Sequence, residues 1–159
     1  MIDEQLAYGG ASPEGVLLML LPFFFAVIVL GMIYFLTGWR QFYKNYPFNP
    51  HANPTDMLNW QSARIGLVNF NNAINFGFSQ HGLYVKPVKL FSFGIFKPLL
   101  FPWHEIMWKK KQRLGFTIIE ITPKKSGTST IVISKALYEK MKPKLKGFAN
   151  IKTPEENVF

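Results

Sequence analysis

Hydrophobic and polar positions follow three successive patterns along this chain. Between Glu14 and Arg40, residues 15–39 contain no charged side chain. From Trp60 onward, apolar and polar residues alternate with a period of two, and beyond Ser134 the apolar residues recur four apart. These patterns predict one long apolar helix, then a β domain, then a C-terminal amphipathic helix.

Residues 15–39 predict a transmembrane helix. At about 1.5 Å per residue the run is roughly 37 Å long, against roughly 30 Å for the hydrocarbon layer of a bilayer. A soluble helix keeps a polar face, and a signal peptide begins with basic residues, whereas Asp3, Glu4 and Glu14 precede this run. We therefore expect a permanent single anchor, with a local kink at Pro22.

The charges on the two sides of this helix are unequal. All eighteen Lys and Arg residues lie from Arg40 onward, while three of the nine acidic residues precede the apolar run. By the positive-inside rule, the N-terminal tail (residues 1–14) is predicted to lie outside the cell membrane and the C-terminal domain in the cytoplasm. Tyr34 and Trp39 are expected at the membrane interface, and Arg40 and Lys44 are expected to retain this orientation.

The remainder of the chain is predicted to form a linker and one sheet. Residues 40–59 hold three prolines among aromatic residues and asparagines, a composition typical of a juxtamembrane linker. About seven strands are expected in a domain over residues 60–146, and the absence of helix-period segments between them predicts an antiparallel sandwich or open barrel. The strands are predicted at residues 62–70, 74–78, 83–85, 89–93, 99–108, 115–122 and 129–133, with reversals at Asn71-Asn72 and Gln80-His81-Gly82 and turn-like or charged segments at 94–98, 109–113 and 123–127.

The amphipathic helix is predicted to begin near Lys135, with Ser134 as its N-cap. One apolar edge, expected to lie on the sheet, is formed by Leu137, Met141 and Leu145. Pro143 should bend or shorten this helix. Residues 147–159 are expected to form an extended or loosely docked tail.

About seven antiparallel strands closed by one helix is the order of elements in pleckstrin-homology-like (PH-like) and GRAM-like domains. Within residues 79–106, the motifs Gly82-Leu83-Tyr84 and Phe101-Pro102-Trp103-His104-Glu105-Ile106 resemble the centre of small bacterial membrane proteins that carry such a domain, with Phe101 in place of the usual Ile. The resemblance implies a PH-like barrel attached to the bacterial inner membrane and specifies no ligand. Alternation predicts that Leu99, Phe101 and Trp103 face inward, with Trp103 and Trp108 as core or rim aromatics.

The soluble part offers no residue pattern typical of catalysis. Its few acids and three histidines do not cluster, and no Walker loop, Rossmann fingerprint or HExxH spacing occurs. His104 and Glu105 are adjacent and, on a strand, would point to opposite faces. The chain has no cysteine, which excludes disulfides and thiolate metal sites. We therefore expect a non-enzymatic protein without cofactor or metal.

Basic side chains gather in two predicted loops and along the last helix. The residues predicted to bind an anionic lipid or a partner are Lys109, Lys110, Lys111, Arg113, Lys124 and Lys125. Each contributes about 1 kcal/mol of attraction where it lies near an anionic leaflet, although ordinary solvated lysines are an equal alternative. A nucleic-acid partner is not expected, since no RNA-binding signature or stacking platform is evident.

Two functions remain open at this point. The chain is either an accessory or scaffold subunit that contacts other membrane protein subunits, or a sensor that binds anionic lipid. An assembly factor is a third possibility. The aromatic-rich anchor and linker and the lack of catalytic patterns favour the first.

Overall fold

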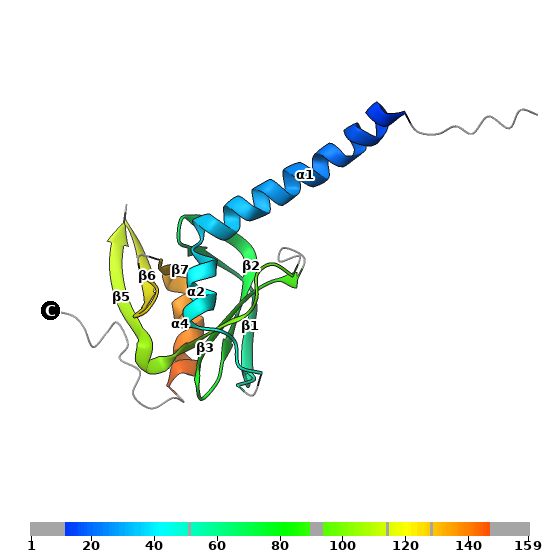
Figure 1. Cartoon of the computed structure of the whole chain (residues 1–159). Coiled ribbons are helices and arrows are strands. Elements are labelled where there is room, and N and C mark those ends of the chain that lie inside the picture. Colours follow the sequence, from blue (N-terminus) through cyan, green and yellow to red (C-terminus); the bar gives the residue numbers. More distant parts are fainter. Residues whose placement is uncertain (1–11, 51, 90–93, 114, 128, 147–159) are drawn as a thin grey trace, which may run out of the picture. The chain divides into compact units, whose positions relative to one another are not determined.

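The structure of the chain is a computed structural model, and it describes residues 12–50, 52–89, 94–113, 115–127 and 129–146. The chain divides into two compact units, Met1–Met32 and Ile33–Phe159. The first unit holds most of one apolar helix, and the second, called the β domain below, holds all the strands (Figure 1). An N-terminal apolar helix, seven antiparallel strands and a C-terminal helix confirm the predicted order of elements.

Helix α1 (Pro13–Leu36) is apolar on every side, and none of its side chains is buried. Its 24 residues make it long and apolar enough to cross a membrane. Its place near the N-terminus is also that of a signal sequence. The helix continues through Pro22 and ends short of the predicted residue 39, because Gly38 adopts a left-handed conformation (φ 68°) that stops it.

The predicted linker contains regular structure. Helix α2 (Trp39–Asn45) follows α1 after two residues, and strand β1 already begins at Asp56. The difference arises because the aromatic residues of this segment belong to the core: Trp39, Phe42 and Tyr46 are buried in the β domain. Composition alone does not distinguish an exposed aromatic linker from a buried one.

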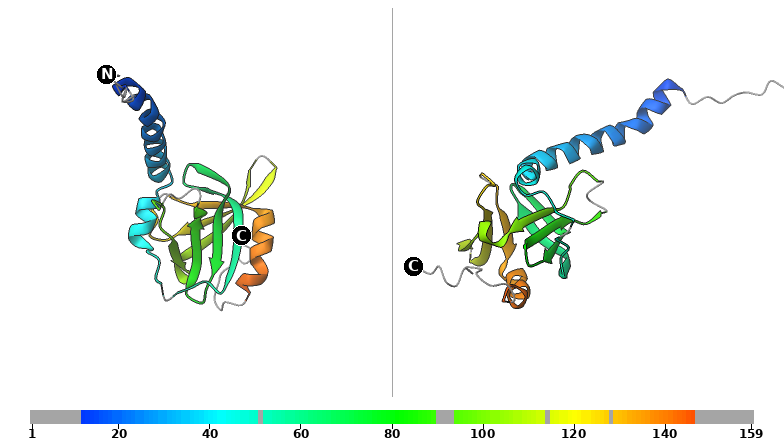
Figure 2. Two further views of the ribbon diagram at one scale, coloured as in Figure 1. Left: turned by 90° about the vertical axis from the view of Figure 1, so that its right-hand side faces the viewer. Right: turned by 60° about the horizontal axis from the view of Figure 1, so that its bottom comes forward.

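The seven strands form one sheet in the order β4-β3-β2-β1-β7-β6-β5, and every neighbouring pair is antiparallel. The sheet curls into a half-barrel, as Figures 1 and 2 show. Its strands are β1 (Asp56–Ile65), β2 (Val68–Phe78), β3 (Gly82–Pro87), β4 (Leu99–Pro102), β5 (Ile106–Arg113), β6 (Phe116–Pro123) and β7 (Ile131–Ser134).

The first reversal of the sheet lies where the sequence did not predict it. β1 and β2 turn at residues 66–67, not at Asn71-Asn72, because Gly66 has the positive φ (56°) of a tight turn. Asn72 also has a positive φ and bonds Ser62 across the strands at a point where the register shifts. The asparagines therefore mark a bulge and not a turn. The second reversal, at Gln80-His81-Gly82, is confirmed.

The predicted strand over residues 99–108 is interrupted. The short 3-10 helix η1 (Trp103–Glu105) separates β4 from β5, so His104 and Glu105 are not strand residues. The charged segment 109–113, predicted as a turn, continues β5, because its residues pair with β6 from Lys109↔Glu120 to Arg113↔Phe116. The strand predicted at 89–93 falls, apart from Lys89, outside the described residues, as do the tails over 1–11 and 147–159.

Helix α4 (Lys135–Leu145) begins where the sequence predicts. The hydroxyl of Ser134 accepts a hydrogen bond from the backbone N–H of Leu137 at 3.1 Å, as an N-cap does. The helix contacts β6 and β7 and ends two residues after Pro143. Its buried side consists of Leu137, Tyr138, Met141 and Leu145, which confirms the predicted apolar edge.

Candidate binding surface

The end of α1 is joined to the β domain by a short buried connection. Thr37 is fully buried, and its hydroxyl donates to the carbonyl oxygen of Tyr34 at 3.0 Å and accepts from the backbone N–H of Trp39 at 3.3 Å. Tyr34 itself is half-buried, with its ring edge-on to that of Phe96 at 5.7 Å between centroids. The last turn of α1 is thus built into the β domain.

Trp39, predicted at the membrane interface, lies fully buried inside the β domain. Its indole N–H donates to the carbonyl oxygen of Lys97 at 2.9 Å, and its ring meets Phe96 edge-on at 5.4 Å. Tryptophan suits an interface because it is apolar with one polar group, but the same property lets it fill a core where that group finds a partner. Here the backbone of residue 97 supplies the partner.

Arg40 and Lys44 remain exposed on α2. They are four residues apart in one helix, so their positive charges lie on the same face, directly after the apolar helix. Beside them, the ammonium of Lys97 lies 5.2 Å from the centre of the Tyr43 ring. This face of α2 therefore carries a cluster of positive charges directly after the end of α1.

The predicted basic run forms a projecting hairpin. In β5, Ile106 and Trp108 are buried, whereas every side chain from Lys109 to Arg113 is exposed. The outer half of β5 and β6 thus extends beyond the core, and residues 109–113 with 115–118 are called the basic arm. Lys111 forms an ion pair with Glu120. Among the described residues, an ion-pair partner is absent for Lys109, Lys110 and Arg113.

Lys124 and Lys125 lie at the other end of β6. They follow Pro123, which pairs with Ile106, whereas the tip of the arm is the pair Arg113↔Phe116. Seven residues of strand separate the two ends by about 23 Å. The structure therefore divides the six predicted cations into two groups that no single small ligand contacts together.

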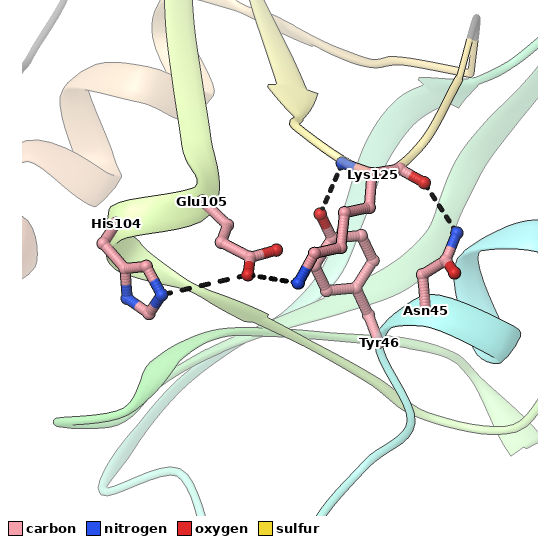
Figure 3. A network of polar contacts seen from close by, with 5 residues as sticks. All are labelled: Asn45, Tyr46, His104, Glu105 and Lys125. Atoms are coloured by element: carbon pink, nitrogen blue, oxygen red, sulfur yellow. Dashed lines mark hydrogen bonds and ion pairs between the residues drawn. The ribbon is translucent and has the colours of Figure 1, made fainter.

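Lys125 holds the turn after β6 against α2 and η1. Its ammonium donates to Glu105 Oε1 at 2.6 Å and its backbone N–H donates to the Tyr46 hydroxyl at 2.8 Å. Its carbonyl oxygen accepts from the Asn45 side-chain amide at 2.6 Å. Figure 3 shows these contacts converging on Lys125. Lys125 thus has a structural role in this turn.

These surroundings stabilise the ionised form of Glu105. The hydrogen bond from Lys125 lowers the pKa of the Glu105 carboxyl below its ordinary value, and desolvation opposes this only in part. Burial raises the pKa of the Tyr46 hydroxyl, partly offset by the backbone N–H of Lys125. His104 lies 3.9 Å from Glu105 Oε1, with most of its side chain in solvent. The group is an ion pair that joins η1 to the turn after β6, and His104 is exposed beside it.

The motifs at residues 82–84 and 101–106 have a structural explanation here. Gly82 lies opposite Pro102, and a Cβ at residue 82 would overlap the carbonyl oxygen of Phe101. The indole N–H of Trp103 donates to the carbonyl oxygen of Ser79 at 2.9 Å, which joins η1 to the β2–β3 turn. Trp103 and Trp108 are both buried, as predicted. These residues shape one edge of the sheet.

Three exposed apolar side chains were not singled out from the sequence. Leu67, in the β1–β2 turn, is 78% exposed; Ile95, before β4, is 42% exposed; and Phe116, at the tip of the basic arm, is 76% exposed. Turns are usually polar, so an apolar residue at a turn is a signal. For Leu67 and Phe116 this signal is visible only once the turns are correctly placed, because the sequence placed these two turns wrongly. Ile95 lies in the segment 94–98, which was predicted to be turn-like.

The chain matches no family model, no curated protein and no solved structure. Across the described ranges, no group of three or more His, Asp or Glu side chains is arranged to hold a metal ion. The candidate binding surfaces are therefore the exposed apolar surface of α1, the cations of α2, the basic arm and the exposed apolar turns.

Proposed function

We propose that the chain is a single-span membrane protein whose β domain serves as a non-enzymatic accessory or scaffold subunit of a larger bacterial membrane complex. The observation that carries the proposal is the exposure of α1, none of whose side chains is buried although it joins a folded domain after only two residues. An apolar surface of this size is stable only where lipid or other membrane helices cover it.

The proposed orientation places the N-terminus outside and the β domain in the cytoplasm, at the inner membrane. Exposed Arg40 and Lys44 support it, because basic residues next to a span are retained on the cytoplasmic side. We also propose that the β domain is PH-like, since seven antiparallel strands followed by one helix is the order of elements that such domains share.

A binding role is supported because the titratable side chains form contacts that hold elements of the fold together. At the junction of α2, η1 and the β6–β7 turn, Lys125 contacts both Glu105, through its ammonium, and Tyr46, through its backbone N–H. Lys144 pairs with Asp56, and Lys111 pairs with Glu120. The titratable groups in these contacts hold elements together, which leaves surfaces rather than an enclosed polar site to carry function.

The anchor and its orientation are tested by mass and by cysteine labelling, because the natural chain has no cysteine. The intact mass of the membrane-bound protein should include residues 1–36, whereas a cleaved signal sequence would remove them. Gln5→Cys should react with a membrane-impermeant maleimide outside intact cells, and Gln80→Cys should react only after lysis. Reaction of residue 80 in intact cells would disprove the orientation.

The scaffold role is tested by gentle detergent extraction of the full chain. We expect a membrane protein to co-purify in fixed stoichiometry through the phenylalanine-rich turn of α1. Replacing Phe23, Phe24 and Phe25 by Leu should abolish this association. Leu replacements at the exposed positions Val27, Ile28 and Met32 are the matched control and should preserve it. A monomer in every preparation would contradict the scaffold role.

A second candidate function, sensing of anionic lipid, is favoured by one observation. Lys109, Lys110 and Arg113 project on the basic arm, and the described part of the chain gives them no ion-pair partner. Changing all three to Ala should remove any protection from hydrogen exchange that phosphatidylglycerol confers on residues 109–118 in nanodiscs. The same change at Lys135 and Lys140 of α4 and at its C-cap residue Lys146 removes equal charge and should leave that protection intact.

A further inference from the structure

The exposed apolar turns lie at one end of the β domain. The β1–β2 turn carries Leu67, and the backbone N–H of Leu67 donates to the carbonyl oxygen of Leu36, the last residue of α1, at 3.2 Å. Gly66 approaches still more closely, since a Cβ there would lie 2.7 Å from the oxygen of Leu36 and 2.8 Å from that of Thr37. Leu67 is therefore fixed at the level of the end of α1.

The segment before β4 is held at the same end. The ring of Phe96 contacts Tyr34 of the last α1 turn at 5.7 Å and Trp39 at 5.4 Å. Its neighbour Ile95 is exposed although it is apolar. Two separate turns thus present an apolar side chain beside the residues that end the apolar helix.

The basic arm reaches the same end of the sheet. In Figure 1 and in the left view of Figure 2, the outer end of the β5–β6 hairpin and the β1–β2 turn lie at the same end of the β domain. At the tip of the arm, Phe116 faces Arg113 across the strands, with Lys109 and Lys110 further along β5. An exposed aromatic ring beside unpaired cations suits the boundary between lipid headgroups and acyl chains.

We propose that this end of the β domain is a membrane-docking face, with Leu67, Ile95 and Phe116 placed in the interfacial layer of the same bilayer that α1 crosses. The inference rests on the proposed function, because it requires α1 to be a span. A helix of 24 residues is about 36 Å long, so one that crosses about 30 Å of hydrocarbon ends in the interface. Leu67, bonded to the end of that helix, then reaches the same layer.

The chemistry of the face specifies an anionic bilayer. The apolar turns favour the boundary of the acyl chains, while Lys109, Lys110 and Arg113 favour negatively charged headgroups. Contacts at separate turns would restrict the rocking of the domain on its helix. The surface presented to other proteins would then be the opposite end, which carries the β2–β3 turn.

Single-cysteine spin labels on the full chain test the proposal. Labels at residues 67, 95 and 116 are compared in nanodiscs that contain phosphatidylglycerol, with residue 24 as the reference for the span and residue 80, in the β2–β3 turn, as the reference for water. Dissolved oxygen, which concentrates in lipid, and a water-soluble nickel complex report the surroundings of each label. Unchanged circular dichroism of each labelled chain shows that the fold is retained.

We expect labels at 67, 95 and 116 to be at least about threefold more accessible to oxygen, relative to nickel, than the label at 80. Lipid-like values at 24 with water-like values at 67, 95 and 116 would overturn the docking face and leave the anchor intact. Water-like values at 24 would instead overturn the proposed span. Protection of the three labels from both reagents would overturn the docking face in favour of a protein partner.

Discussion

Helices α1 and α2 are separated by two residues and are both rich in aromatic side chains, yet they use them in opposite ways. In α1, Phe24 is 63% exposed and Phe35 is 83% exposed, and no side chain of the helix is buried. In α2, Trp39 and Phe42 have no exposed surface at all. The difference shows that aromatic content does not by itself identify a membrane segment.

The two helices differ in what surrounds them, and the residues between them decide where one environment ends. Thr37 is buried and Gly38 has a left-handed backbone, so the chain leaves the apolar helix and enters the core within one turn. In the sequence, aromatic residues recur from Phe23 to Phe48. The structure divides this segment into a lipid-suited surface and a protein core.

The largest expected effect comes from truncating one phenylalanine in each helix. Phe42→Ala should destabilise the β domain by about 3–5 kcal/mol, because it removes a fully buried ring that packs edge-on against Phe101. Phe24→Ala should leave the stability of the β domain unchanged. Guanidinium unfolding in mild detergent, followed by tryptophan fluorescence, measures both. Equal losses of stability in the two variants would contradict the proposed difference between α1 and α2.

A smaller loss is expected from Gly66→Ala, which tests the contact between the β1–β2 turn and the end of α1. The new Cβ would crowd two carbonyl oxygens at a positive φ, and we expect a loss of about 3 kcal/mol. Gly115→Ala is the matched control, since residue 115 also has a positive φ but, among the described residues, no atom lies within 4 Å of a Cβ there. Gly115→Ala should lower the free energy of unfolding by about 1 kcal/mol. The same unfolding assay separates them.

The smallest effect concerns the far end of α2, where Glu105 pairs with Lys125 beside Tyr46 and Asn45. Glu105→Gln should cost about 0.2–1 kcal/mol at pH 7, because the ion pair is partly in solvent. The pKa of Glu105 is lowered in the folded chain, so its stabilisation is complete above the ordinary value of 4.5 and disappears as the pH falls through the lowered value.

Unfolding measured from pH 7 to pH 2.5 should therefore show the wild-type and Glu105→Gln curves converging in acid. The variant Lys125→Met removes the same pair from the other side. In that background, Glu105→Gln should add little, as expected for two residues that act through one contact. A constant difference between the curves at all pH values would assign the effect to packing and not to charge.

Local sequence patterns were sufficient to predict much of the fold. The uncharged run, the period of two and the apolar spacing after Ser134 predicted α1, an antiparallel sheet and α4, because each pattern reflects the exposed or buried face of its own element. The first turn was missed because Asn71-Asn72 is a stronger turn signal than Gly66-Leu67, and only the pairing of β1 with β2 shows that the asparagines form a bulge.

The candidate binding surfaces were harder to predict from the sequence than the fold. The six cations of two predicted loops were expected to bind an anionic lipid or a partner, but a strand of eight residues carries Lys124 and Lys125 to the opposite end from Arg113. The exposed side chains of Leu67, Ile95 and Phe116 were missed for a related reason. Whether an apolar residue at a turn is exposed depends on which other segments pack against that turn.

The sequence by itself determined the elements whose causes are local: an apolar helix without a charge, alternating strands and a capped C-terminal helix. The tertiary structure alone decided that Trp39 belongs to the core, that Lys125 is held by Glu105, and that Leu67 lies beside the end of α1. These facts depend on contacts between residues tens of positions apart. Such contacts follow from how the sheet curls and pairs, which no window of sequence contains.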